Sequence, residues 1–183
     1  TLGLLGLFAF LNVIGISESA VVAMGIFGLH LLTLTALVVT SIIKFGFDFT
    51  IFLNNWAMPA PGGLVRAVVF GFAAGLLGIS GFESSANFIE EQKKGVFVKT
   101  LRNMWVAVFV FNPLISFLAM CVMPLSDAWT VVDGVKTPRA DFLAHMAQIT
   151  AGDWLATLVS VDAVLVLSGA VLTAYVGVTG LVR

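Results

Sequence analysis

Long apolar runs separated by shorter polar segments make up most of this chain. A membrane-spanning helix needs about 20 mostly apolar residues, at about 1.5 Å each, to cross a hydrocarbon core of about 30 Å. The pattern predicts five such helices, at Leu2–Ile16, Val21–Ile43, 67–92, Met104–Met123 and Trp154–Val182. We therefore expect an all-α fold, a polytopic bundle of transmembrane helices that forms a single domain over residues 1–183.

The polar segments predict the connections between these helices. Ser17–Ser19 is short enough for a tight turn between antiparallel neighbours, and Lys44–Arg66 contains Asn, Pro and Gly residues typical of a loop. Within that loop, Phe47–Trp56 is expected to lie along the membrane interface, where aromatic residues are enriched. The longest polar segment, Ser126–Asp153, is expected to contain a short helix at Arg139–Ile149.

Composition supports a lipid environment. Hydrophobic residues make up 60% of the chain and charged residues 10%, against about 25% charged residues in soluble domains. Cys121 is the single cysteine, and His30 and His145 are the only histidines. Neither a disulfide framework nor a metal-ligand cluster is therefore predicted, and no cofactor is expected. The nine basic residues are too scattered to indicate a nucleic-acid partner.

The basic residues predict the orientation in the membrane. Four of them follow the third predicted helix within a short segment, at Lys93, Lys94, Lys99 and Arg102. Basic residues in short loops favour the cytoplasmic side, so we expect this segment to be cytoplasmic. The predicted localisation is a multi-pass integral protein of the cell (inner) membrane, with the lipid bilayer as its surroundings.

The third predicted helix contains the strongest functional signal. Gly78 and Gly81 are poor helix formers, and Ser80 between them can bond to nearby backbone. Glu83 follows deep in an apolar stretch, where a charge is costly unless it faces a cavity or a partner. We expect the helix to break at Leu77–Phe82, which would free backbone groups to bind a ligand.

Packing is the alternative explanation of these glycines. Gly71 and Gly75 have the G-x-x-x-G spacing of a close helix contact, and the same cause could extend to Gly78. Beyond the predicted break, polar residues four, three and four positions apart indicate one helical face that turns inward, namely Ser80, Ser84, Asn87 and Glu91.

Four further polar positions leave alternatives open. His30 lies one turn from Thr33 in the second predicted helix, and either takes part in proton coupling or is a neutral side chain bonded to a neighbouring helix. Asp162 is either solvated near the outer interface or turned inward and paired. Ser168 and Thr173 could contribute to a sodium site, although small residues four apart here favour packing.

The order of these motifs resembles one transporter family. Gly81-Phe82-Glu83-Ser84, followed by Glu90-Glu91 and then a basic segment, resembles the sixth helix of the amino acid–polyamine–organocation (APC) permeases. Gly15–Ala20 is similar to that family's turn between helices four and five, and Asp162–Gly177 to its eighth helix. The chain thus looks like a fragment that covers helices four to eight of a LeuT-like inverted-repeat fold.

The resemblance implies secondary transport of an amino acid or related amine by alternating access, with a proton or sodium ion as coupling ion. The backbone of the break would bind the substrate at Gly78, Ile79, Ser80, Gly81 and Phe82. Phe82 would close over the substrate, and Glu83 matches a position where some members carry a proton-sensitive Glu. His30 would join Glu83 in coupling.

Two other functions compete with this interpretation. A potassium or other cation transporter or channel on a related fold would share the same helix pattern. A membrane-embedded enzyme is the weaker alternative, because no Ser/His/Asp set stands at a readable spacing. We therefore expect a transporter and not an enzyme.

Overall fold

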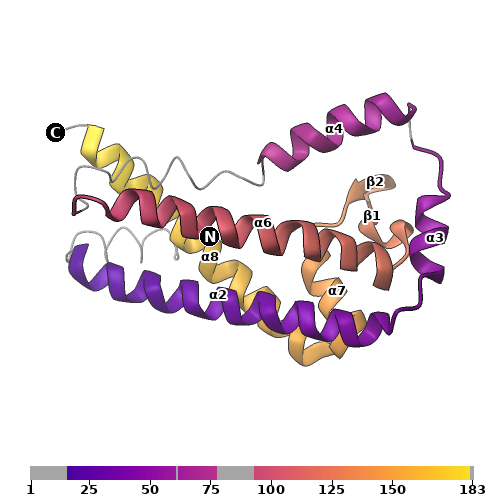
Figure 1. Cartoon of the computed structure of the whole chain (residues 1–183), viewed down its shortest axis with the longest axis horizontal. Coiled ribbons are helices and arrows are strands. Elements are labelled where there is room, and N and C mark those ends of the chain that lie inside the picture. The colour runs from indigo at the N-terminus through magenta and orange to yellow at the C-terminus, as the bar shows by residue number, and fades with distance from the viewer. Residues whose placement is uncertain (1–15, 61, 78–92, 182–183) are drawn as a thin grey trace.

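The computed structural model describes residues 16–60, 62–77 and 93–181, and these residues form a mostly helical assembly (Figure 1). The long helices are α2 (Ile16–Phe45), α6 (Val96–Val122) and α8 (Asp153–Leu181). The shorter helices are α3 (Thr50–Trp56), α4 (Leu64–Leu77) and α7 (Phe142–Ala151). A 3-10 turn η1 (Leu125–Ala128) and two strands, β1 (Trp129–Val132) and β2 (Val135–Pro138), connect α6 to α7.

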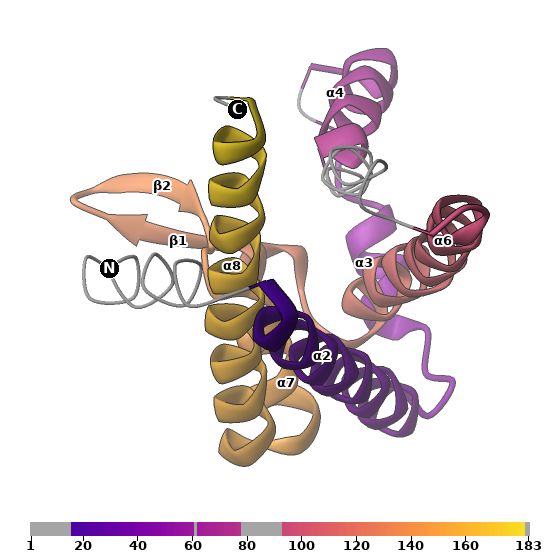
Figure 2. The same ribbon diagram turned by 90° about the vertical axis from the view of Figure 1, so that its left-hand side faces the viewer.

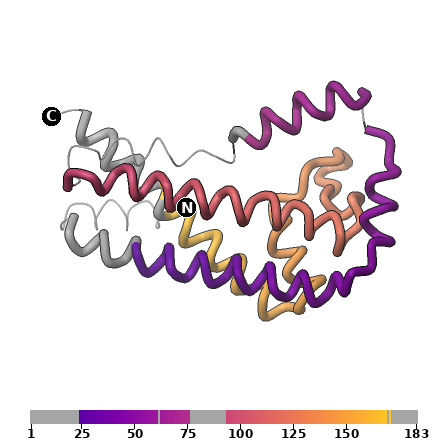
Figure 3. Tube along the Cα trace, viewed as in Figure 1, coloured from indigo at the N-terminus to yellow at the C-terminus, as the bar shows by residue number. Residues whose placement is uncertain are grey.

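The core lies where α2, α6, α7 and α8 pack together. Helix α2 contacts each of the other three, and α7 packs along α8. Figures 2 and 3 show α2 beside α7 and the adjoining part of α8. The side chains at the centre are apolar and almost fully buried, and they include Leu37, Leu118, Cys121, Met146 and Leu155.

Two helices are long and apolar enough to cross a membrane among the described residues, Met24–Phe45 and Val96–Val122. Large apolar side chains on both helices remain exposed, such as Phe27 and Ile43 on α2 and Phe109 on α6. Many exposed apolar side chains on one helix are typical of contact with lipid or with other apolar helices. The exposed side chains therefore fit the membrane environment that the composition predicts.

Helix α4 stands apart from the rest of the assembly in Figures 1 and 2. Its apolar side chains, among them Val65, Phe70 and Phe72, are more than half exposed. A Cβ atom added at Gly71 or Gly75 would meet no neighbouring atom within 4 Å among the described residues. The predicted G-x-x-x-G packing face therefore has no partner in the described part of the chain.

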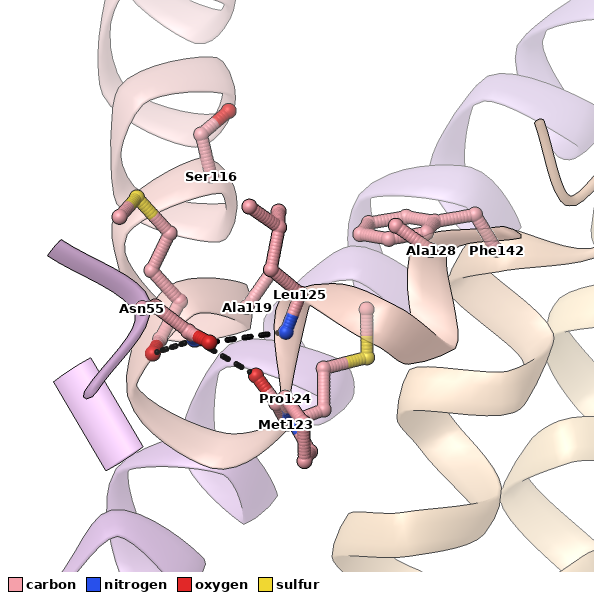
Figure 4. Close-up of a pocket in the computed structure, with 9 residues that line it drawn as sticks. Asn55, Ser116, Ala119, Met123, Pro124, Leu125, Ala128 and Phe142 are labelled. Atoms are coloured by element: carbon pink, nitrogen blue, oxygen red, sulfur yellow. Dashed lines mark hydrogen bonds between the residues drawn. The ribbon is translucent and has the colours of Figure 1, made fainter. Parts of the chain in front are cut away.

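Helix α3 closes the end of the α2–α6 pair through aromatic contacts and one amide. Phe52 lies 5.6 Å from Phe117 of α6 between ring centroids. The Asn55 side chain donates to the backbone oxygens of Met120 and Met123, each at 2.9 Å, and accepts from the Leu125 N–H at 2.8 Å (Figure 4). Because α6 ends at Val122, Asn55 binds backbone groups that no longer have helical partners.

A hairpin forms within the long polar segment between α6 and α7. Strands β1 and β2 pair antiparallel, with Val132 opposite Val135. Asp133 and Gly134 have φ angles of 51° and 76°, as a two-residue type I′ turn requires. The Asp-Gly pair was the available sequence signal for this hairpin, which the hydrophobic pattern alone does not predict.

Several helix boundaries differ from the predicted ones. Helix α2 begins at Ile16, so Ser17–Ser19 form its first turn and not a connecting turn. Helix α6 begins at Val96 and includes Lys99 and Arg102, because Lys and Arg are good helix formers. The short helix expected at Arg139–Ile149 is α7, shifted by about one turn.

The first prediction concerns Asn55. Asn55→Ala removes three hydrogen bonds and leaves buried backbone groups unpaired, so we expect a loss of about 2–4 kcal/mol in unfolding free energy. Thermal unfolding can be followed by maleimide labelling of Cys121, which is 2% exposed in the fold. The adjacent, exposed Asn54→Ala is the matched control, with an expected change within about 0.5 kcal/mol. An equal unfolding free energy for the two variants would contradict the stabilising role of the Asn55 hydrogen bonds.

The second prediction concerns Asp48, before α3. Its carboxylate accepts from the Thr50 hydroxyl at 2.6 Å and the Thr50 N–H at 2.9 Å, and these bonds hold the pKa of Asp48 below 3.8. Because the folded-state pKa is lowered, the stabilisation is present above the unfolded-state pKa and is lost as pH falls through the folded-state pKa.

Thr50→Val should therefore raise the pKa of Asp48 toward 3.8, since it removes the hydroxyl bond, which is the larger cause. The Asp48 carboxyl can be titrated by ¹³C NMR. Thr35→Val, which removes an exposed hydroxyl bonded within α2, serves as control. An unchanged Asp48 titration in Thr50→Val would show that the hydroxyl contributes nothing.

Candidate functional site

A hydrogen-bonded His–Asp pair joins two long helices near the centre of the assembly. His30 Nδ1 of α2 lies 2.7 Å from Asp162 Oδ2 of α8. Asp162 is 3% exposed, whereas the His30 side chain is 32% exposed. An ionisable group in a membrane helix is costly unless it is paired or faces a cavity, and Asp162 meets the first of these conditions through His30.

Two buried oxygens beside this pair lack hydrogen-bond partners in the described part of the chain. Asp162 Oδ1 and Thr33 Oγ1 are both buried and both unpaired. Thr33 lies three residues after His30, and therefore on a neighbouring position of the same face of α2. Both oxygens can therefore accept a hydrogen bond beyond those that the described residues make.

A cavity of about 510 Å³ adjoins the pair between α2, α7 and α8. Its polar lining comes from His30, Thr33, Ser160 and Asp162, and from Asp141 before α7. The other lining residues are apolar: Leu34, Ala140, Phe142, Leu143, Ala144, Val159, Ala163, Val166 and Leu167. Small-molecule sites commonly have this volume and this mixture of apolar walls with a few polar groups.

The remaining charges near the cavity are partly neutralised at its rim. Arg139 Nε lies 3.6 Å from Asp141 Oδ1. His145 of α7 lies 3.8 Å from Asp127 Oδ2, so it is directed at η1 and is not a lining residue of the cavity. The Ser160 hydroxyl donates to Ala156 O at 2.8 Å within α8. Among the described residues, Asp162 is thus the buried acid of this cavity.

A second, smaller cavity of about 240 Å³ lies beside Asn55 at the end of α6 (Figure 4). Its walls include Ala119, Met123 and Phe142. Asn55 already bonds to three backbone groups there. We therefore assign this region a structural role, in which Asn55 connects α3 to η1.

The predicted substrate-binding residues lie outside the described part of the chain. This applies to Gly78, Ile79, Ser80, Gly81 and Phe82, and to Glu83. The helix break and the coupling role of Glu83 stay predictions. The side chain of Thr173 is also outside the described residues, while the Ser168 hydroxyl donates to Val164 O within α8.

The structure shows the surroundings of His30 and Asp162, and the coupling role of His30 stays a prediction. Asp162 is turned inward and paired, and His30 is bonded to a neighbouring helix. Sequence reasoning considered each residue alone and missed that they are partners, because 132 positions separate them. The available signal was that each polar residue needed a partner within an apolar run.

Two long apolar helices with exposed hydrophobic side chains, and a His–Asp pair between two helices, fit an α-helical integral membrane protein. A family model described as amino acid permease matches residues 1–183. The chain therefore belongs to the amino acid permease family, whose members are transporters of the permease kind, and this confirms the predicted resemblance. Neither a curated protein nor a solved structure matches this chain.

The third prediction tests the His30–Asp162 pair by a double-mutant cycle. His30→Ala or Asp162→Ala each leaves a buried partner unpaired, so the double variant should lose less stability than the sum of the two. We expect a coupling free energy of about 0.5–3 kcal/mol, measured by Cys121 labelling during thermal unfolding. The control cycle combines His30→Ala with Ser160→Ala, whose hydroxyl bonds within α8. If the losses of stability are additive in both cycles, the side chains of His30 and Asp162 do not interact.

Proposed function

We propose that this protein is a secondary active transporter that moves an amino acid or related amine across the cell membrane by alternating access, with protons as the coupling ion. The observation that carries the proposal is the match of the whole chain to the amino acid permease family. The His30–Asp162 pair supports the choice of protons, because it places an imidazole 2.7 Å from an almost fully buried carboxyl group between two long helices.

The proposed substrate site is the predicted helix break. Freed backbone N–H and C=O groups at Gly78–Phe82 would bind the amino and carboxylate groups of the substrate. Phe82 would cover the bound substrate, and Glu83 would change its protonation during the cycle. His30 would act with Asp162 on the α2–α8 side of the bundle.

The proposal accounts for the position of the polar groups. Burying an ionisable side chain in a membrane costs free energy, and an apolar side chain would pack the helices without this cost. In a proton-coupled carrier the same side chains provide the coupling, because protonation changes which conformation is favoured. A difference in proton affinity between the two conformations is the condition for such a shift.

The fourth prediction tests transport and the role of Glu83. The purified protein in proteoliposomes should take up labelled amino acids faster when the outside is made acidic. Glu83→Gln should reduce this pH-driven component of uptake roughly 5- to 150-fold. This range of factors corresponds to typical coupling free energies between two sites. Glu90→Gln, seven positions further along the sequence, is the matched control and should retain it.

The outcomes separate the competing functions. Equal pH-driven uptake by wild type and Glu83→Gln would exclude Glu83 from coupling. Uptake of rubidium, a potassium surrogate, without uptake of any amino acid would instead identify a cation transporter.

A further inference from the structure

The exposed face at the start of α6 changes from basic to aromatic along the helix. Lys99 and Arg102 are three positions apart, and Trp105 follows after three more, so these side chains lie on one side of α6. Phe109 continues that side four positions later, and its ring stacks on Trp105 with 5.1 Å between the ring centroids. All four side chains are exposed. A bilayer offers the same order of surroundings, because charges suit its headgroups and aromatic rings its interface.

The length of α6 indicates which part of it leaves the hydrocarbon core. Its 27 residues span about 40 Å at about 1.5 Å per residue, whereas the core is about 30 Å thick. A length of about 10 Å, or two helical turns, therefore remains outside the core. Both charged residues of α6, Lys99 and Arg102, lie in its first two turns. Because charges are costly in the core, we place the excess length at this end, among the lipid headgroups.

Lys99 and Arg102 have no acidic partner among the described side chains. The ion pairs of the described residues all lie elsewhere. Lys93 and Lys94, which are also exposed, precede α6 and add positive charge, although Glu90-Glu91 stand just before them in the sequence. Lys99 and Arg102 are farther from these acids along the chain, so their charges remain available to an anion at the membrane surface.

We propose that the face formed by Lys99, Arg102 and Trp105 binds the headgroup of an anionic phospholipid, with an acyl chain along Phe109. The Arg102 guanidinium can donate two parallel hydrogen bonds to the phosphate, and Lys99 supplies a second cation. A zwitterionic phospholipid has the same phosphate, but its own ammonium group offsets the charge, so it should bind more weakly. The inference goes beyond the transport proposal and depends neither on it nor on the helix break.

The experiment uses Trp105 as a reporter of the lipid beside it. Trp56, Trp129 and Trp154 are each more than 40% exposed, so replacing all three by Phe should be tolerated and leaves one tryptophan. The purified protein is reconstituted in phosphatidylcholine vesicles that contain increasing fractions of phosphatidylglycerol brominated on its acyl chains. Bromine quenches the indole fluorescence on contact. We expect phosphatidylglycerol to be preferred over equally brominated phosphatidylcholine at least about fivefold, the contribution of one basic residue at a charged surface.

Salt and soluble anions test the nature of this preference. Raising NaCl from about 0.1 M to about 1 M shortens the Debye length from about 10 Å to about 3 Å, and should reduce the preference at least about twofold. Inorganic phosphate at a fixed ionic strength should leave it unchanged, because the site includes the interface beside Trp105 and binds a lipid.

Variants assign the preference to the two cations. Lys99→Gln combined with Arg102→Gln should lower it to within about twofold of unity. The matched control combines Lys44→Gln with Arg66→Gln, which removes the same charge from exposed residues at the other end of the assembly, where α2 ends and α4 begins (Figure 1). That end lies several Debye lengths away, so we expect a change of less than about twofold. Lys99→Arg keeps the charge and should retain the preference.

Four results would each overturn the proposal. They are equal quenching of wild-type Trp105 by the two brominated lipids, equal effects of the two double variants, loss of the preference in Lys99→Arg, and its loss on addition of inorganic phosphate. The last result would assign the basic face to soluble anions. Labelling of Cys121, which is 2% exposed in the fold, verifies that each variant is folded.

Discussion

The hydrogen bond between His30 and Asp162 is the constraint on which the arrangement of α2 and α8 depends. A carboxyl group that is 3% exposed has little contact with solvent, so the hydrogen bond to its imidazole partner stabilises it. Because the two residues come from distant parts of the chain, their bond sets which faces of α2 and α8 meet. Thr33 and the cavity adjoin that same contact.

The apolar core and the polar pair have different roles in this assembly. Leu37, Met146 and Leu155 fill the space between α2, α7 and α8, and their contacts hold the helices together without specifying one register. A buried polar pair penalises every register in which it is separated. The assembly therefore gains specificity from this pair.

Asn55 likewise pairs polar groups that would otherwise lack partners, at the C-terminal end of α6. The last carbonyl groups of a helix need partners from outside the helix, and the Asn55 amide provides them for Met120 and Met123. Aromatic rings on α2, α3 and α6 surround this junction, with Phe45 and Phe49 4.8 Å apart. The polar amide thus lies in an apolar environment, where its hydrogen bonds are strong.

By itself, the sequence determined the mostly helical class and the permease family, because these depend on local hydrophobicity and on motif order. The pattern also marked His30 and Asp162 as polar residues in need of partners. Only the tertiary structure decided that they pair with each other and that a cavity adjoins them, since contacts across 132 positions leave no trace in local periodicity. The start of α6 at Val96 was likewise missed, because Lys99 and Arg102 are polar and yet good helix formers, so they do not end the helix.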